Sequence, residues 1–179
     1  RGIDLYLLNR GNRKEFIPPN VKTIKCDIRD LKSASESLKS YFFDVVVNWT
    51  AFTPEHIKTD LELFEGKVSQ YIFISSASAY QKPLSHYIVT ESTPLCNPYW
   101  QYSRDKIACE ELLMDKYRNS GFPITIVRPS FTYGVSMIPA ALNSWNHPWS
   151  LIDRMKKNKE IIVHGDGTSL WTMTHNRDF

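Results

Sequence analysis

Cysteine is scarce in this chain of 179 residues, and the three cysteines present, Cys26, Cys96 and Cys109, are far apart. Their number is odd, and their spacing matches neither the paired ligands of a zinc site nor a disulfide framework. No apolar run approaches the ~20 residues that a helix needs to cross a bilayer, and no signal-peptide pattern opens the chain. We therefore expect a reducing, cytoplasmic setting, no metal site and no membrane partner.

A strong excess of one charge is also lacking. The formal net charge is +3, and the densest basic cluster is Lys156, Lys157 and Lys159. So short a cluster is typical of a solvated helix face, so a nucleic-acid partner is not expected from charge. The apolar fraction of 42% and the charged fraction of 23% are average for a soluble globular protein. The length suffices for one domain, or for one domain and part of another.

Short apolar runs alternate with segments of helical periodicity along the first 130 residues. Their composition predicts strands at 4–8, 21–26, 44–48, 71–75 and 124–127. Apolar residues at helical spacing predict helices at 31–41, around 58–64 and at 102–117. Mostly apolar strands that alternate with helices indicate a parallel sheet covered on both faces. The predicted fold class is therefore α/β with a doubly wound parallel sheet.

The character of the chain changes after Pro129. Residues 137–150 are rich in Pro, Asn and Trp and are predicted to be irregular. A helix at 151–157 and a strand at 160–163 are predicted to follow, before a Gly-Asp-Gly turn. We therefore divide the chain into a partial sheet domain at 1–129 and the start of a smaller lobe at 130–179.

Ser76, Tyr102 and Lys106 are the residues most indicative of chemistry. Ligands of a doubly wound sheet bind beyond the carboxyl ends of its strands, and Ser76 follows the predicted strand at 71–75. Tyr102 and Lys106 are four positions apart at the start of a helix, so their side chains share one face. A phenol of ordinary pKa ~10 is a poor base, and we expect the neighbouring ammonium to lower that pKa. Ser76 would then hold a substrate oxygen while Tyr102 moves its proton.

The Tyr-x-x-x-Lys spacing alone is weak, because chance supplies it roughly once in a chain with this many tyrosines and lysines. Four segments in order are more specific: FISSASAY (73–80), YSRDK (102–106), VRPSFTYG (127–134) and HGDGTS (164–169). Together they resemble the extended short-chain dehydrogenases, which include NAD(P)-dependent nucleotide-sugar epimerases and dehydratases. The resemblance covers nearly the whole chain. It implies a Rossmann-like, partial dinucleotide-binding domain at 1–129 and a partial substrate-binding lobe at 130–179.

The resemblance also implies roles for single residues. The implied catalytic trio is Ser76, Tyr102 and Lys106. The implied cofactor-binding residues are Asp27, Ile28, Asn48, Trp49, Thr50 and Lys106, the last through the nicotinamide ribose. We therefore expect an enzyme with NAD or NADP as cofactor, an epimerase or reductase of a sugar or nucleotide-sugar-like substrate that works by acid-base chemistry and hydride transfer.

Asn9 and Arg10 follow the first predicted strand, where an NAD enzyme usually carries an acidic residue for the ribose 2′-hydroxyl. An arginine without an acid suits a 2′-phosphate, which slightly favours NADP, although a surface arginine in a turn is the alternative. The family's G-x-x-G-x-x-G motif is absent and would fall before Arg1. We therefore expect a sheet that lacks its first strand, in a chain truncated at both ends.

Departures from the family's pattern bear on the substrate. Dehydratases of the family carry an Asp-Glu pair where this chain has Ala77 and Ser78, which disfavours a sugar dehydratase. Phe131 replaces the Asn of an R-P-x-N motif, and Trp171 replaces a diphosphate-binding arginine. We expect Ser78, Phe131 and Trp171 on the substrate side. The alternative is that the two aromatic residues simply repack the interface between the lobes.

The segments RPSFTYG and HNRD (175–178) look more like an atypical branch that includes the chloroplast stem-loop-binding proteins. That branch favours a second hypothesis, a Rossmann scaffold that binds NAD(P) and RNA or protein, with lost or vestigial catalysis. The two hypotheses differ in whether Tyr102 is needed for turnover. A small sugar-like molecule is the expected partner under the first, and a homo-oligomer is left open under both.

Overall fold

The computed structural model describes residues 2–12, 17–135, 137–138, 142, 144, 146–168 and 170–179. Parts of the segment predicted to be irregular, and Ser169 of the HGDGTS motif, lie outside these residues. The elements are, in order, β1 (Tyr6–Asn9), β2 (Lys22–Lys25), α1 (Leu31–Leu38), β3 (Phe43–Asn48), α2 (Pro54–Phe64), β4 (Val68–Ile74), the 3₁₀ helix η1 (Ala77–Ala79), α3 (Gln101–Ser120), β5 (Ile124–Val127), β6 (Phe131–Tyr133), α4 (Ser150–Lys156) and β7 (Met173–His175).

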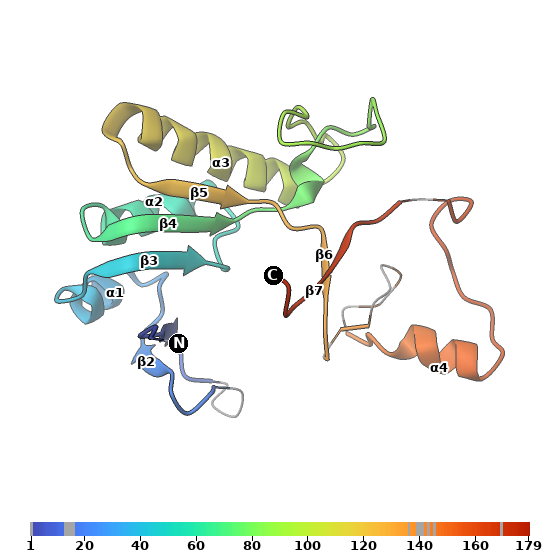
Figure 1. The fold of residues 1–179 in the computed structure, drawn as a ribbon, viewed down its shortest axis with the longest axis horizontal. Coiled ribbons are helices and arrows are strands. Elements are labelled where there is room, and N and C mark those ends of the chain that lie inside the picture. Colours follow the sequence, from blue (N-terminus) through green and yellow to red (C-terminus); the bar gives the residue numbers. More distant parts are fainter. Residues whose placement is uncertain are drawn as a thin grey trace.

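All strand pairs of the described residues are parallel. They form the sheets β1–β2, β3–β4–β5 and β6–β7, and β4 is the central strand of the largest (Figure 1). The predicted α/β fold with a parallel sheet is confirmed. β1 and β3 belong to separate hydrogen-bonded sheets, as expected for a doubly wound sheet that lacks its first strand.

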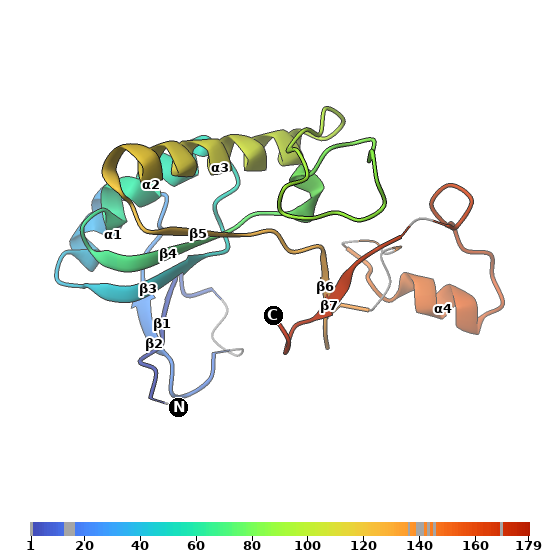
Figure 2. The same ribbon diagram turned by 45° about the horizontal axis from the view of Figure 1, so that its top comes forward.

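The helices between the sheet strands lie on one face of the β3–β4–β5 sheet. Figure 2 shows α2 and α3 side by side above it. Successive strands are neighbours in the order β3, β4, β5, and right-handed crossovers in one direction place their helices on the same side. On β3, Val45 and Val47 remain 46% and 43% exposed. The expectation that both faces are covered is therefore wrong for the described residues.

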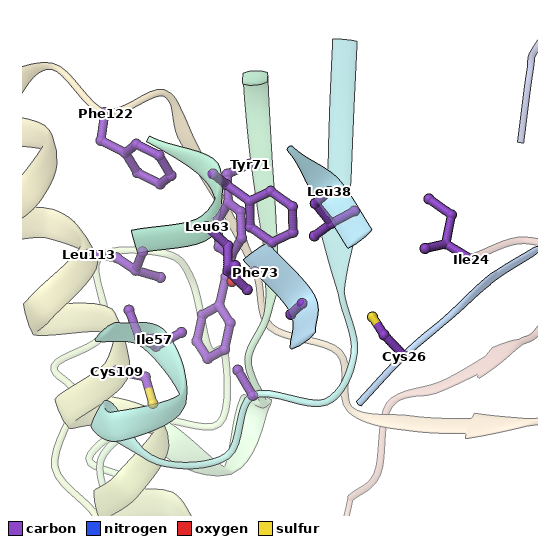
Figure 3. Close-up of a cluster of buried hydrophobic side chains, with 13 residues drawn as sticks. Ile24, Cys26, Leu38, Ile57, Leu63, Tyr71, Phe73, Cys109, Leu113 and Phe122 are labelled. Carbon is purple, nitrogen blue, oxygen red and sulfur yellow. The ribbon is translucent and has the colours of Figure 1, made fainter. Parts of the chain in front are cut away.

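One apolar core joins the β1–β2 and β3–β4–β5 sheets under these helices. Tyr71 and Phe73 of β4 are fully buried, because alternate residues of a strand point to the same face. Ile24 of β2 and Leu38 of α1 extend the same cluster (Figure 3). Its further labelled members are Cys26, Ile57, Leu63, Cys109, Leu113 and Phe122. Burial of each large side chain here stabilises the packing of β4 against α2 and α3 by about 1.5–3 kcal/mol.

Several elements differ from the sequence prediction. The first helix ends at Leu38 rather than at Tyr41, because Tyr41 stacks on Phe43 with ring centroids 5.5 Å apart. The prediction of a strand at 160–163 is wrong: these residues form no strand, and Ile162 is 89% exposed and pairs with no strand of the described residues. β6 and β7 were not predicted, since each is three residues long and depends on a partner far along the chain.

α3 is longer than predicted and ends before a glycine with a left-handed backbone conformation. Gly121 follows its last residue with φ of 70°, in the left-handed region that glycine adopts without strain. Pro123 then prevents the helix from continuing. Within the described part of the chain, no helix is both long and apolar enough to cross a membrane.

Candidate active site

Lys106 links α3 to the carboxyl ends of two strands. The residue is 1% exposed, and its ammonium donates hydrogen bonds to the carbonyl oxygens of Ala51 (2.7 Å) and Ile74 (2.8 Å). It also lies 4.9 Å from the ring centroid of Phe52 and 4.6 Å from that of Phe73. Burial lowers the pKa of Lys106 to about 8. A neutral fraction of this amine is therefore present in weakly alkaline solution.

Tyr102 lies one helical turn before Lys106 and is half-buried. Its ring centroid is 4.7 Å from that of Trp100 and 6.4 Å from that of Phe52. We expected Lys106 to lower the pKa of the phenol. Instead, burial raises the pKa of Tyr102, and the neighbouring Ser76 hydroxyl offsets this only in part. Because burial opposes its ionisation, Tyr102 is a neutral phenol, and the Lys106 ammonium donates to backbone carbonyls instead.

Ser76 and Ser78 form a fixed pair at the start of η1. The Ser76 Oγ accepts a hydrogen bond from the Ser78 backbone N–H at 3.2 Å and lies 2.9 Å from the Ser78 Oγ. The Ser103 hydroxyl donates to the Ser78 Oγ at 2.9 Å, and the Asn97 side-chain amide donates to the Ser78 carbonyl at 2.8 Å. The structure thus brings Ser78, predicted on the substrate side, against both Ser76 and the first turn of α3.

A tight turn follows β3, and we call residues 48–51 the Asn48 turn. The Asn48 Oδ1 accepts hydrogen bonds from the backbone N–H groups of Thr50 (2.6 Å) and Ala51 (2.9 Å). An asparagine that bonds its own following backbone is a common way to set such a turn. The Trp49 ring is 55% exposed and packs on Phe179 at 5.2 Å. The turn presents the residues that were predicted to line the cofactor at the edge of the sheet.

The other predicted cofactor residues gather at the carboxyl ends of β1 and β2. The Asn9 side chain accepts a hydrogen bond from the Gly11 N–H at 2.7 Å. The Arg10 guanidinium is 4.0 Å from the Asp27 carboxylate, and both side chains are largely exposed. Ile28 packs against the core. A weak, solvated ion pair of this kind can exchange for a ligand at little cost.

Phe131 and Trp171 lie together in the β6–β7 part. Their ring centroids are 6.5 Å apart in an edge-to-face arrangement. His164 stacks on Trp171 at 5.9 Å. Among the described residues, neither aromatic side chain makes a ring contact with Tyr102. The structure therefore groups the two predicted aromatic residues with each other but does not join them to the trio.

Sequence reasoning missed a buried carboxylate on α2. Asp60 is 1% exposed and accepts hydrogen bonds from the Tyr71 hydroxyl at 2.6 Å and from the Asn48 side-chain amide. The Arg29 guanidinium lies 3.4 Å from it. The available signal was the position of Asp60 on the apolar face of a predicted helix, three residues after Ile57.

A second missed carboxylate, Glu110, lies one turn after Lys106 on α3. It is 2% exposed and accepts hydrogen bonds from the Ser75 hydroxyl and from the Arg128 guanidinium. Arg128 also donates to the Tyr80 hydroxyl at 3.2 Å. Its hydrogen bonds to Glu110 hold the pKa of Arg128 above its usual range. This ion pair ties α3 to the ends of β4 and β5 behind the trio.

The burial of Asp60 predicts a pH-dependent stability. Desolvation raises the pKa of Asp60 from 3.8 to about 6, although Tyr71 and Arg29 oppose the rise. An acid with a higher pKa in the folded state holds its proton more tightly there, so the contribution of Asp60 to the free energy of unfolding falls as the pH rises from about 4 to about 6 and is then constant. A shift of about two units corresponds to ~3 kcal/mol.

Urea unfolding of the intact protein at pH 4 and pH 7 measures this difference. Burial lowers the pKa of His56, which contributes to the pH dependence with the opposite sign, so the comparison must be made with Asp60→Asn. The variant should lack the fall in stability that the wild type shows across this range. The same pH dependence in both proteins would contradict the prediction.

Sequence comparison relates the chain to a known family. The model of the NAD dependent epimerase/dehydratase family matches residues 1–179. A putative UDP-glucose 4-epimerase of Methanocaldococcus jannaschii is 27% identical over 180 residues, which cover 89% of this chain and 56% of that protein. The chain spans about half the length of the curated relatives it matches.

Solved structures show the same fold. A UDP-glucose 4-epimerase of Thermotoga maritima, solved with UDP-glucose, has a TM-score of 0.77 at 18% identity, over 97% of this chain and 62% of that one. A dTDP-glucose 4,6-dehydratase of Bacillus anthracis, solved with NAD, has a TM-score of 0.70 at 23% identity, over 88% of this chain and 51% of that one. By its sequence over the full length, this chain belongs to the NAD dependent epimerase/dehydratase family.

Proposed function

We propose that the protein is an NAD(P)-dependent epimerase or reductase that acts on a sugar or nucleotide-sugar-like substrate. The observation that carries the proposal is that Ser76, Tyr102 and Lys106 meet at the carboxyl edge of the β3–β4–β5 sheet. Family membership supports an NAD-type cofactor, and the Methanocaldococcus jannaschii relative supports a sugar nucleotide. The aromatic residues Phe131 and Trp171 favour a departure from the standard nucleotide-diphosphate sugar.

The proposed chemistry follows from the state of each side chain. Tyr102, held neutral by burial, donates its proton to a substrate oxygen or takes it back. Ser76 donates a hydrogen bond to the same oxygen and so fixes its position. The bound cofactor would supply hydride exchange at the substrate carbon. Lys106 would hold the cofactor ribose, and its ammonium lies 5.7 Å from the centroid of the Tyr102 ring.

The residues present fit such a cofactor. The proposed cofactor-binding set is Asn9, Arg10, Asp27, Ile28, Asn48, Trp49, Thr50 and Lys106. Apart from Lys106 of α3, its members lie at or just beyond the carboxyl ends of β1, β2 and β3, where a doubly wound sheet binds its ligand. The bonds of Lys106 to described residues use two of its three N–H donors, which leaves a donor for a ribose hydroxyl.

We further propose that 1–129 is the dinucleotide-binding part and 130–179 the start of the substrate lobe, with Ser78, Phe131 and Trp171 facing the substrate.

All three cysteines are free, with Cys26 and Cys109 buried and Cys96 exposed. Free thiols support a reducing, cytoplasmic location.

The function is tested with the intact protein, NAD or NADP, and a panel of sugars, sugar nucleotides and small carbonyl compounds. Product isomers must be measured, because an epimerase regenerates its cofactor and shows no net absorbance change. Conversion of one substrate to its isomer or reduced form supports the proposal. A protein that binds cofactor but converts nothing would contradict it and favour the scaffold hypothesis, for which RNA binding is then assayed.

Lys106→Met should reduce both turnover and cofactor affinity, because this residue serves both. Loss of a charged hydrogen bond to the ribose predicts a rise of about tenfold or more in the dissociation constant of the cofactor. Ser76→Ala should slow turnover and leave the dissociation constant unchanged. Lys58→Met, at an exposed position of α2, is the control and should change neither. Normal cofactor binding in Lys106→Met would remove Lys106 from the proposed cofactor site.

Arg10→Ala tests the proposed preference for NADP. If the guanidinium contacts a 2′-phosphate, the dissociation constant of NADPH should rise by about tenfold or more. That of NADH, which lacks the phosphate, should change less than about twofold and serves as the control. Calorimetry on the intact protein measures both constants. A wild type that prefers NADH, or a variant with unchanged NADPH affinity, would contradict the preference.

A further inference from the structure

Three hydrogen-bond donors converge on the carboxylate of Asp60. They are the Tyr71 hydroxyl, the Asn48 side-chain amide and the Arg29 guanidinium. Only a group with acceptors alone can satisfy all three, and an ionised carboxylate is such a group. Its side chain is 1% exposed, so water cannot replace a missing partner at low cost. The three donors therefore require an ionised carboxylate at position 60.

Two of these donors also hold the Asn48 turn. Asn48 bonds Asp60 with its amide nitrogen and accepts the Thr50 and Ala51 N–H groups with its oxygen. Arg29 reaches Asp60 with one nitrogen and donates to the Thr50 carbonyl at 3.0 Å with the other. The bond to Asp60 thus decides which way the Asn48 amide faces, and that orientation caps the turn.

The Asn48 turn also binds the Lys106 ammonium. The carbonyl of Ala51, its last residue, accepts the Lys106 ammonium at 2.7 Å. The third donor to Asp60, the Tyr71 hydroxyl, lies on β4 and contacts the carboxylate from the core. Asp60 is therefore connected to Lys106 through Asn48 and Ala51, whereas Tyr71 shares the carboxylate without bonding the turn.

We propose that Asp60 is a positioning residue, which orients Asn48 and Arg29 so that the Asn48 turn holds the Lys106 ammonium at the site. The proposal rests on the proposed function only in that the turn and Lys106 are assigned to the cofactor there. Asp60 itself is beneath the site and touches no reacting atom.

Asp60→Asn is the direct test, because it keeps the shape and changes one acceptor into a donor. Whichever way the new amide faces, its N–H group meets either the Asn48 amide or the Arg29 guanidinium. One of the two hydrogen bonds that connect residue 60 to the Asn48 turn, through Asn48 or through Arg29, is then lost. Combining Asp60→Asn with Asn48→Asp restores a donor opposite an acceptor and keeps the net charge. Tyr71→Phe is the matched control, since it removes a bond to the same carboxylate away from the turn.

The readout is the rate at which acetic anhydride acetylates the Lys106 amine in the intact protein without cofactor, followed by mass spectrometry. Alkylation of the Cys109 thiol by iodoacetamide, run in parallel, reports opening of α3 itself, because Cys109 is 0% exposed on the same helix. Asp60→Asn should raise the Lys106 rate by about tenfold relative to the Cys109 rate. In Tyr71→Phe the two rates should stay in proportion within about twofold. The double variant should return the ratio to within about twofold of the wild type.

Equal increases at Lys106 and Cys109 in Asp60→Asn would overturn the proposal, because they would show general loosening. A double variant no better than the single one would do the same. If Asp60→Asn does not fold, Arg29→Lys replaces it: a lysine can pair with Asp60 but lacks the fork that reaches Thr50, so the same selective increase is expected.

Cofactor titration of the same proteins separates this proposal from the proposed function. A wild type that binds neither NAD nor NADP would contradict the function, while the labelling ratio would still decide the role of Asp60. If the wild type binds cofactor, Asp60→Asn should weaken that binding and the double variant should restore it.

Discussion

Tyr102→Phe is expected to lower turnover by the intact protein ~10²–10⁴-fold, the usual cost of losing a general acid-base group. The variant removes one hydroxyl and keeps the ring, which packs between Trp100 and Phe52. The fold and the dissociation constant of the cofactor should therefore stay the same. A fall in turnover with unchanged cofactor binding separates loss of proton transfer from loss of structure.

Tyr117→Phe is the control for this experiment. Tyr117 lies on the same helix, is 52% exposed and is remote from the trio in sequence. Its substitution should leave turnover unchanged. If Tyr102→Phe retains full activity on a substrate that the wild type converts, Tyr102 is not the proton-transfer group and the proposed mechanism is wrong.

Arg128→Met is expected to lower the free energy of unfolding by ~3–5 kcal/mol, the usual cost of breaking a buried ion pair by removing one partner. The guanidinium donates to both carboxylate oxygens of Glu110, at 3.0 Å from Nε to Oε1 and 2.6 Å from Nη2 to Oε2. The Glu110 side chain is 2% exposed, so little water can replace the arginine. Urea unfolding of the intact protein measures the loss.

An exposed ion pair on α4 provides the control. Lys157 and Asp153 are 2.8 Å apart with more than half of each side chain exposed, and Lys157→Met should cost less than ~1 kcal/mol. Replacing Glu110 as well, by Gln in the Arg128→Met background, removes the unpaired charge and should recover part of the loss. If Arg128→Met and Lys157→Met lowered the free energy of unfolding equally, the prediction that the Arg128–Glu110 ion pair stabilises the fold would be wrong.

The sequence by itself determined the class of fold and the position of its main elements. Apolar runs predicted the strands from β1 to β5, and helical spacing predicted α3, because both patterns are periodic and local. Tyr102 and Lys106 were predicted to share a face for the same reason, since residues four apart on a helix are neighbours. The order of the motifs then indicated the family.

The sequence could not determine features that depend on partners far along the chain. Within the described part of the chain, β6 and β7 pair with each other, and the apolar residues at 160–163 pair with no strand. The direction in which the Tyr102 pKa shifts depends on burial by packed rings, and this burial cannot be inferred from helical spacing.

Only the tertiary structure revealed the two buried carboxylates and their tasks. Asp60 and Glu110 are ordinary acidic residues in the printed sequence, each within a helix that also carries exposed charges. The fold places Arg29, Asn48 and Tyr71 around one, and Arg128 and Ser75 around the other. Burying a charge is costly unless such partners converge on it, and convergence is a property of packed elements rather than of neighbours in sequence.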